Sequence, residues 1–342
     1  MSRSIRTCVA LLLVQHALAQ APTLRIELLH EGTGISLRGL SVANDNVAWV
    51  SGSKGTVGRT TNGGKTWNWW VVKGFESTDF RDIEAFDART ALIMGVGAPA
   101  YILRTIDGGE SWTVVYENRD KRMFLDAMEF WNEQSGIVLG DPVDGRFFVA
   151  RTFDGGRSWR DSPLEDRPRA DSGEACFAAS GTNVRSLDRD QAVFVSGGRR
   201  SRLFIRDQTI DLPILQGGES TGANSVAVWD NLKREGGKRM IVVGGDFNRD
   251  SSTRLNCFFT DNGGRNWRTP QVPPGGYRSC VEYFSRNEAF ACGPSGVDRT
   301  IDGGKIWTPV SATGFHVVRT SKLGAAVYFA GANGRVGKLV RP

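Results

Sequence analysis

Short runs in which apolar and polar residues alternate recur along most of the chain, and they predict β-strands. The runs 101–105 and 145–151 each lead directly into a turn-forming segment, as in a β-hairpin. Upstream of such a hairpin lie a first strand, a short turn and a second strand ending in glycine, as in 80–86 and 91–95. This pair recurs at residues 123–130 with 136–140 and at residues 277–284 with 288–293. Helical periodicity is weak, so the pattern predicts an all-β chain.

One motif fills the turn after the third strand five times. It ends in tryptophan and occupies residues 61–67, 106–112, 153–159, 261–267 and 301–307. Successive tryptophans are 45, 47, 108 and 40 residues apart, and 108 is two steps of about 54 with one copy missing. A repeat of this length is typical of architectures in which each unit buries its apolar face against the next. The 42 glycines and ten tryptophans of the chain fit short strands joined by tight turns.

Each copy of the motif, called a box below, has a structural explanation. Its second residue is Asp or Asn, whose side chain can accept hydrogen bonds from backbone N–H groups in a turn. Two glycines then allow positive φ, and the closing tryptophan packs a large apolar surface against the sheet. The residues assigned to this role are Asn62, Trp67, Asp107, Trp112, Asp154, Trp159, Asn262, Trp267, Asp302 and Trp307. The boxes resemble Asp-boxes (bacterial neuraminidase repeats), which implies a β-propeller whose blades carry a box between the third and fourth strands.

The blades can be counted from the boxes. The missing copy corresponds to a blade with strands at 174–180, 191–197 and 201–206, in which residues 207–210 replace the box. After the last box the chain has three strands without a fourth, at 314–320, 325–331 and 335–340, and the strand 24–30 can complete them. Closure of this kind removes exposed sheet edges. We therefore expect an all-β, seven-bladed propeller of four-stranded antiparallel blades, with the last blade closed by both termini. Six blades with an N-terminal arm is the alternative.

The N-terminus has the pattern of a secretory signal. Arg3 and Arg6 precede a short apolar core, and Ala17–Ala19 forms a small-residue cleavage site. We expect cleavage near Ala19 to leave residues 20–342 as one propeller domain, periplasmic or secreted and monomeric.

Cysteine and histidine usage limits the chemistry of the site. Cys280 and Cys292 face each other across one predicted hairpin, so an exported chain can join them in a disulfide; two buried thiols are the alternative. Only His30 and His316 lie beyond the signal, which disfavours a histidine metal site or a histidine-based triad. The segment 246–252 begins like a calcium loop but lacks its central glycine and final glutamate. We expect no metal and no cofactor.

Charge suggests a binding surface. The formal charge of +6 falls to +4 without the two signal arginines, which is too small an excess to favour nucleic acid as a partner. Arginines concentrate in one loop and in the connection before it, on the rim opposite the boxes. The candidate binding residues of this rim are Arg199, Arg200, Arg202, Arg206, Arg167, Arg169, Asp82 and Asp141. An acidic protein surface fits such a patch, and a solvated rim is the alternative.

Catalysis requires a different set of residues. A glycosidase uses two carboxyl groups around the sugar, and Asp82, Glu84, Asp126, Glu129, Asp141, Asp144 and Asp246 are candidates. Tyrosine is scarce, and no tyrosine–glutamate pair typical of a sialidase is evident. An oligosaccharide-binding module would instead use exposed aromatic residues such as Trp69, Trp70 and Trp131.

The repeated Arg-Thr-x-Asp-Gly-Gly-x-x-Trp, the first strand at 80–83 and the glycine closing each second strand resemble the photosystem II stability/assembly factor family. That resemblance implies an exported seven-bladed propeller that binds assembling membrane-protein subunits without catalysis. It also implies an arginine-rich surface, for which Arg199, Arg200 and Arg202 are the positions to compare. The sequence thus predicts a protein-binding or assembly scaffold whose partner is an envelope membrane protein or assembly complex. The alternatives are a carbohydrate-active hydrolase and a glycan-binding module.

Overall fold

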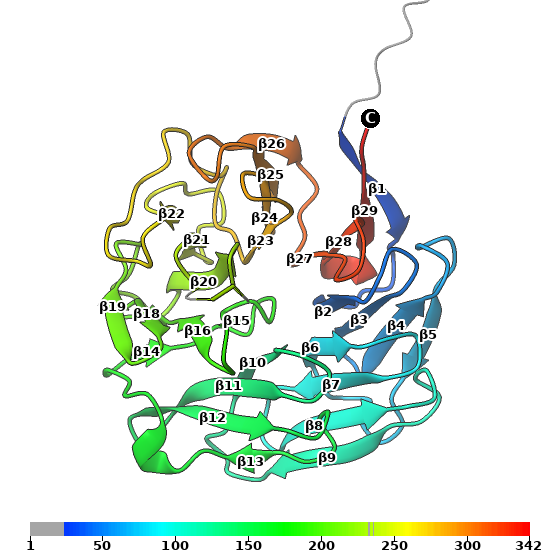
Figure 1. Ribbon diagram of the computed structural model, residues 1–342. Coiled ribbons are helices and arrows are strands. Elements are labelled where there is room, and N and C mark those ends of the chain that lie inside the picture. Colours follow the sequence, from blue (N-terminus) through cyan, green and yellow to red (C-terminus); the bar gives the residue numbers. More distant parts are fainter. Residues whose placement is uncertain (1–23, 232, 235) are drawn as a thin grey trace, which may run out of the picture.

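The computed structural model describes residues 24–342 except 232 and 235, and these residues form seven antiparallel sheets arranged in a ring around a common centre (Figure 1). The prediction of seven blades is confirmed. Four blades follow the predicted order of consecutive strands, with the first strand innermost. Their strands are, in blade 1, β2 (Leu37–Val42), β3 (Ala48–Gly52), β4 (Thr56–Thr60) and β5 (Asn68–Val71); in blade 2, β6 (Phe80–Ala85), β7 (Ala91–Gly95), β8 (Ala100–Thr105) and β9 (Thr113–Asn118); in blade 3, β10 (Leu125–Phe130), β11 (Gly136–Val143), β12 (Arg146–Thr152) and β13 (Arg160–Asp161); and in blade 6, β23 (Cys280–Tyr283), β24 (Ala289–Gly293), β25 (Gly296–Thr300) and β26 (Thr308–Ser311).

Blades 4 and 5 are less regular. Blade 4 consists of β15 (Val184–Ser186), β16 (Ala192–Val195), β18 (Arg202–Ile205) and β19 (Gln208–Asp211). Blade 5 consists of β20 (Thr221–Val228), β21 (Met240–Asp246) and β22 (Cys257–Thr260), extended by β17 (Gly197–Gly198) and β14 (Glu174–Ala175). A single bridge between Phe259 and Arg268 stands at the place of its fourth strand.

The prediction that residues 174–180 form the first strand of blade 4 is wrong. The innermost strand is β15, which pairs Val184 with Phe194, whereas Glu174 pairs with Gly198 at the edge of blade 5. The apolar run 174–180 stays buried, but it belongs to the connection between blades. A short 3-10 helix, η1 (Leu164–Asp166), lies in the same connection.

Blade 7 is built from both ends of the described chain. The strands β27 (Val317–Thr320), β28 (Val327–Ala330) and β29 (Val336–Val340) are completed by β1 (Arg25–His30), which pairs Arg25 with Val340 and Ile26 with Leu339. A second 3-10 helix, η2 (Ala332–Gly334), precedes β29. The predicted closure of the last blade by both ends of the chain is therefore confirmed.

The strand directions define two faces. Because neighbouring strands are antiparallel, the ends of the innermost strands lie on the same face as the boxes, here called the box face. The loops between second and third strands and the connections between blades lie on the opposite, or rim, face. Buried apolar clusters fill the space between adjacent blades and hold the disc together. None of the helices in the described part of the chain is long and apolar enough to cross a membrane.

Candidate functional site

The polar residue of each box is used by its own turn. In the blade-3 box, Asp154 accepts hydrogen bonds from the Thr152 hydroxyl (2.8 Å) and the Ser158 backbone N–H (3.0 Å). Burial opposes the charge of Asp154, but these bonds lower its pKa to about 2. Asn62 of blade 1 accepts from the Thr60 hydroxyl (3.1 Å) and from the Thr66 backbone N–H (3.0 Å) in the same way. The geometry thus supports a structural role for the boxes.

The arginines of the rim are largely paired with local acids. Arg202 is 9% exposed, and its Nε donates to Glu174 at 2.9 Å. Arg200 donates from Nε to Asp211 at 2.8 Å and also pairs with Asp171. Within the described residues, exposed Arg199 has no ion-pair partner. The rim therefore offers one unpaired cation from this run rather than three.

The other three candidate arginines of the rim do not all lie in one place. Arg167 lies on Phe148 at 4.7 Å, and its Nε donates to the Ser162 carbonyl. The backbone carbonyl of Arg169 accepts a hydrogen bond from the guanidinium group of Arg202. Arg206 stands at the far end of β18 and donates to the Gly236 carbonyl at 2.8 Å. Its assignment to the rim is wrong, because the strand carries it to the box face.

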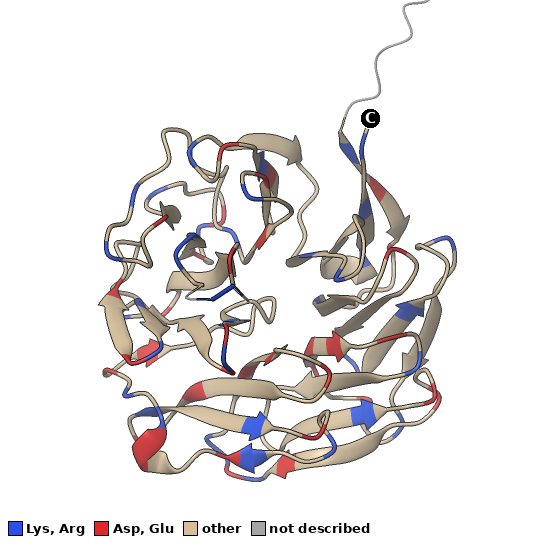
Figure 2. Ribbon diagram, in the orientation of Figure 1, with Lys and Arg blue, Asp and Glu red and all other residues tan. Residues whose placement is uncertain are grey.

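Charges of both signs are interspersed around the disc (Figure 2). Near the loop that carries Arg199, Arg200 and Arg202, called the arginine loop below, the acids that pair with arginines are Asp161, Asp171, Glu174 and Asp211. A surface balanced in this way attracts an acidic partner less than its arginine count suggests.

Of the candidate carboxylates near the rim face, Asp82 and Asp126 are buried and Asp141 is partly buried. Asp82 is 1% exposed, and burial raises its pKa to about 8, although its oxygens accept from the N–H groups of Ile83 (2.8 Å) and Met128 (2.7 Å). Asp126 is 0% exposed, and burial together with nearby Asp141 raises its pKa well above its ordinary value. Burial also raises the pKa of Asp141 to about 6. The structure brings Asp126 and Asp141 together, but Asp126 is sealed from solvent and cannot contact a sugar, so the two do not form a pair of catalytic carboxyl groups around a substrate.

The other candidates serve local structure. Asp144 pairs with Arg122 at 2.7 Å, and Asp246 accepts from Ser220 at 2.8 Å. Trp69 and Trp70 are half-buried and stack on Trp67 and Trp49. Within the described residues, no group of three or more histidines, cysteines or acids is arranged to hold a metal ion.

Cys280 and Cys292 are direct cross-strand partners, as the hairpin predicts. Both are buried free thiols in this structure. The disulfide stays a prediction.

A ring of equivalent positions surrounds the channel on the box face. Each member lies near the end of the innermost strand of its blade. It pairs with the second residue of the second strand, as Glu84 of β6 pairs with Leu92 of β7. The ring consists of Ser41, Glu84, Glu129, Arg185, Ala227, Glu282 and Arg319. Glutamate at this position of the predicted strands 80–86, 123–130 and 277–284 is the sequence signal that could have revealed it.

Ion pairs connect the ring across the channel. Arg185 of blade 4 contacts Glu282 of blade 6 at 2.8 Å and Glu129 of blade 3 at 3.7 Å. Arg319 of blade 7 reaches the same Glu282 at 3.7 Å. Because Arg185 is 5% exposed, these charges are fixed in place rather than mobile.

The ring forms the floor of a depression of about 630 Å³, called the channel mouth below. Five aromatic residues line its walls together with smaller apolar and polar side chains: Phe86, Phe130, Trp131, Trp229 and Tyr283. Leu323 lies at its edge and is 79% exposed. Lys322 pairs with Glu84 and donates to the Ala85 carbonyl at 3.0 Å. Fixed charges beneath aromatic walls suit the docking of a protein segment.

Comparisons with known proteins agree with this architecture. No family model matches the chain, and no curated protein matches it. A structure described as YCF48 bound to D1 peptide is 16% identical, with a TM-score of 0.65 over 94% of this chain and 96% of that chain. YCF48 from Cyanidioschyzon merolae is 17% identical, with the same TM-score over 92% of this chain and 98% of that chain. The WD40 propeller domain of Doa1 is 12% identical, with a TM-score of 0.60 over 93% and 97% of the two chains. The chain therefore shares the seven-bladed propeller fold with YCF48 and with WD40 domains.

Proposed function

We propose that this protein is an exported, non-catalytic scaffold that binds a partner protein across its channel mouth. The observation that carries the proposal is the depression of about 630 Å³, in which five aromatic side chains stand in the walls around a floor of fixed charges. Aromatic residues around a concave site are typical of the centres of protein interfaces. The structural neighbour with a bound D1 peptide is an instance of a propeller of this shape holding a protein segment.

The channel mouth is well prepared for binding. The charged groups of its ring are already in ion pairs, so a partner does not need to order them. Exposed Leu323 supplies apolar area that association removes from water. By the resemblance of the boxes and strands, the partner we propose is an envelope membrane protein or an assembly complex.

The rim stays a second proposed surface, in a reduced form. Arg202 and Glu174 form a buried pair that shapes the loop, so exposed Arg199 is the residue through which an acidic partner would be recognised. This surface is separable from the channel mouth because the two lie on opposite faces of the disc.

The proposal is tested by quantitative capture of partners from the native envelope with tagged variants. Leu323→Glu places a charge on the apolar edge of the channel mouth, and Arg199→Glu reverses the unpaired cation of the rim. Val71→Glu is the matched control, since Val71 is 57% exposed on the outermost strand of blade 1. We expect Leu323→Glu to reduce capture at least about tenfold, the equivalent of 1.4 kcal/mol, and Val71→Glu to leave it unchanged.

Loss of capture with Arg199→Glu but not with Leu323→Glu would move the binding surface to the rim. Equal capture by all variants would contradict both surfaces. Each variant needs an unchanged thermal unfolding profile, so that loss of capture reports on binding and not on folding.

A further inference from the structure

The boxes do more than turn the chain, because each closes the seam between its blade and the preceding one. In the blade-3 box, a Cβ atom on Gly156 would lie 2.3 Å from the side chain of Leu92 in blade 2. In the blade-2 box, Gly109 lies against Trp49 of blade 1, and the box residue Trp112 packs edge-on against the same ring at 6.4 Å. The same arrangement places Gly264 of blade 5 against Leu203 of blade 4. The glycines thus permit close approach, and the tryptophans fill the core.

Two seams have no box to close them. Blade 7 has none, and the seam between blades 6 and 7 is covered by Arg341, which lies 3.9 Å from the ring centre of Phe284 and pairs with Glu288 at 3.1 Å. Blade 4 has none either, because Arg206 and Asp207 form a two-residue turn between β18 and β19. The seam between blades 3 and 4 therefore lacks both the glycine pair and the tryptophan.

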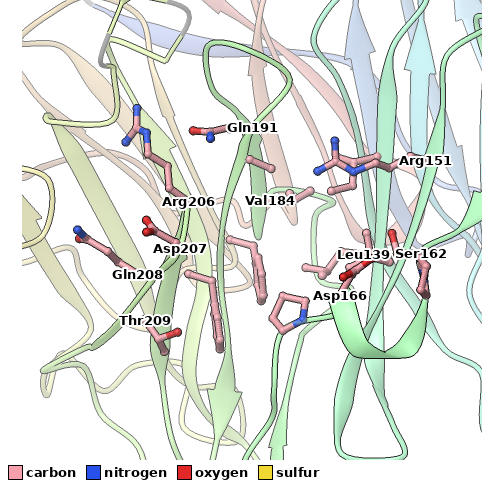
Figure 3. Close-up of a pocket in the computed structure, with 17 residues that line it drawn as sticks. Leu139, Arg151, Ser162, Asp166, Val184, Gln191, Arg206, Asp207, Gln208 and Thr209 are labelled. Atoms are coloured by element: carbon pink, nitrogen blue, oxygen red, sulfur yellow. The ribbon is translucent and has the colours of Figure 1, made fainter.

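A cavity of about 590 Å³ opens at this seam, here called the blade 3–4 seam. Its apolar floor consists of Ile137, Leu139, Val149, Phe194 and Phe204. Figure 3 shows Arg151 and Ser162 on one wall and Arg206, Gln208 and Thr209 on the facing wall. The cavity volume is within the range of sites that bury a small ligand or a large side chain.

The cavity floor is part of the apolar core between blades 3 and 4. Phe194 and Phe204 stack at 4.3 Å on the cavity floor, and Phe147 meets both edge-on at 5.3 Å in the core of the same seam. An inserted ring would extend this inter-blade core as the box tryptophans extend the others.

The polar lining favours a neutral segment with an available carbonyl group. Arg151 and Arg206 are balanced by Asp166 and Asp207. Arg104, the residue of blade 2 that corresponds to Arg151, donates to the carbonyl of Gly155 in the next box at 3.1 Å. Arg151 donates to the Asp190 carbonyl at 2.9 Å, but blade 4 offers it no box carbonyl. A carbonyl group of an incoming turn would give Arg151 the hydrogen bond that Arg104 makes with Gly155.

We propose that the blade 3–4 seam binds a glycine turn followed by a tryptophan, presented by a partner protein. Such a segment supplies in trans what the five boxes supply in cis. The glycines let its backbone approach β11 and β16, the indole fills the apolar floor, and a turn carbonyl accepts from Arg151. This site is separate from the channel mouth and does not depend on the function proposed for it.

The test uses the purified chain and a synthetic peptide with the sequence of residues 104–114, which contains the blade-2 box. Fluorine labelling of its tryptophan allows binding to be followed by ¹⁹F NMR. We expect saturable binding by the wild-type protein, and at least about tenfold weaker binding of the same peptide with tryptophan replaced by alanine. Thr209→Trp, an exposed position on the wall of the seam, should occupy the floor and abolish binding.

The matched control is Thr308→Trp, which adds the same side chain at an exposed position on the outer strand of blade 6. It should bind the peptide as the wild type does. Equal binding of the two peptides, or peptide binding unaffected by Thr209→Trp, would overturn the proposal. Thermal unfolding of both variants verifies that they fold.

Discussion

At the residue scale, Asp and Asn perform the same task in the boxes. Asn62 reproduces the two acceptor bonds of Asp154, and its Nδ2 donates to the Thr66 hydroxyl at 2.8 Å. The negative charge of the aspartate is therefore not what holds the turn. Its acceptor oxygen is.

Two substitutions at Asp154 test this interpretation. Asp154→Ala removes the acceptor for Thr152 and Ser158 and should destabilise the protein by about 1–2 kcal/mol. Asp154→Asn keeps the acceptor and should unfold close to the wild type in a thermal melt. If Asn were as destabilising as Ala, the structural assignment of the boxes would fail, and a role for the charge would have to be sought.

A second residue-scale prediction concerns pH. Burial raises the pKa of Asp82 from an ordinary 3.8 to about 8. Its contribution to stability is complete below pH 3.8, where both states are protonated, and it falls towards pH 8 because only the unfolded chain releases the proton. The free energy of unfolding of the wild type should therefore decrease by a few kcal/mol relative to that of Asp82→Asn as pH rises from 4 to 8.

Denaturant unfolding at pH 4, 6 and 8 measures this difference. The two Asp82 oxygens accept one hydrogen bond each from the backbone N–H groups of Ile83 and Met128, whereas an asparagine side chain has only one accepting oxygen at this place. Asp82→Asn should therefore be less stable than the wild type at pH 4. Exposed Glu110→Gln provides the control and should follow the wild type at each pH. A constant gap between wild type and Asp82→Asn across this range would contradict a buried, protonated Asp82.

Residue roles were predictable from sequence only where a local pattern fixed them. The box residues act through bonds within five positions of the chain, so their spacing was enough. Asp82 was proposed for the rim, but its burial depends on Gly181, whose missing side chain leaves room for the carboxylate. A contact between blades 2 and 4 has no signature in either segment.

At the element scale, β1 closes the ring. It supplies the outermost strand of blade 7, and Ile26 and Leu29 pack against the core that blade 7 shares with its neighbours. Its alternating pattern and its place before the first blade were sufficient to predict this closure. Blade 4 was harder, because the buried run 174–180 is as apolar as a strand and only its pairing with Gly197 and Gly198 reveals its true position.

Removal of β1 should open the ring. A chain that starts at residue 32 exposes the edge of β29 and the apolar side chains beneath, so we expect a lower melting temperature and rapid proteolysis within blade 7. A chain that starts at residue 24 keeps β1 and is the control. Equal melting temperatures for the two chains would contradict a stabilising role of β1 in closing the ring.

At the scale of the whole molecule, the disc presents two distinct faces. The sequence predicted the arginine loop as the binding surface, since a run of three arginines is visible in one dimension. It could not predict that Asp171, Glu174 and Asp211 return to pair with them. The channel mouth was missed for the opposite reason, because its charged ring is assembled from one residue per blade, far apart in the chain.

The central claim is that a partner protein docks on the channel mouth. Site-specific photo-crosslinking in the native envelope tests it most directly, with a benzophenone side chain placed at position 323, at position 199 or at position 71. We expect one protein to be crosslinked from position 323 and not from position 71. Equal crosslinking from positions 323 and 71, or crosslinking from position 199 alone, would contradict docking at the channel mouth.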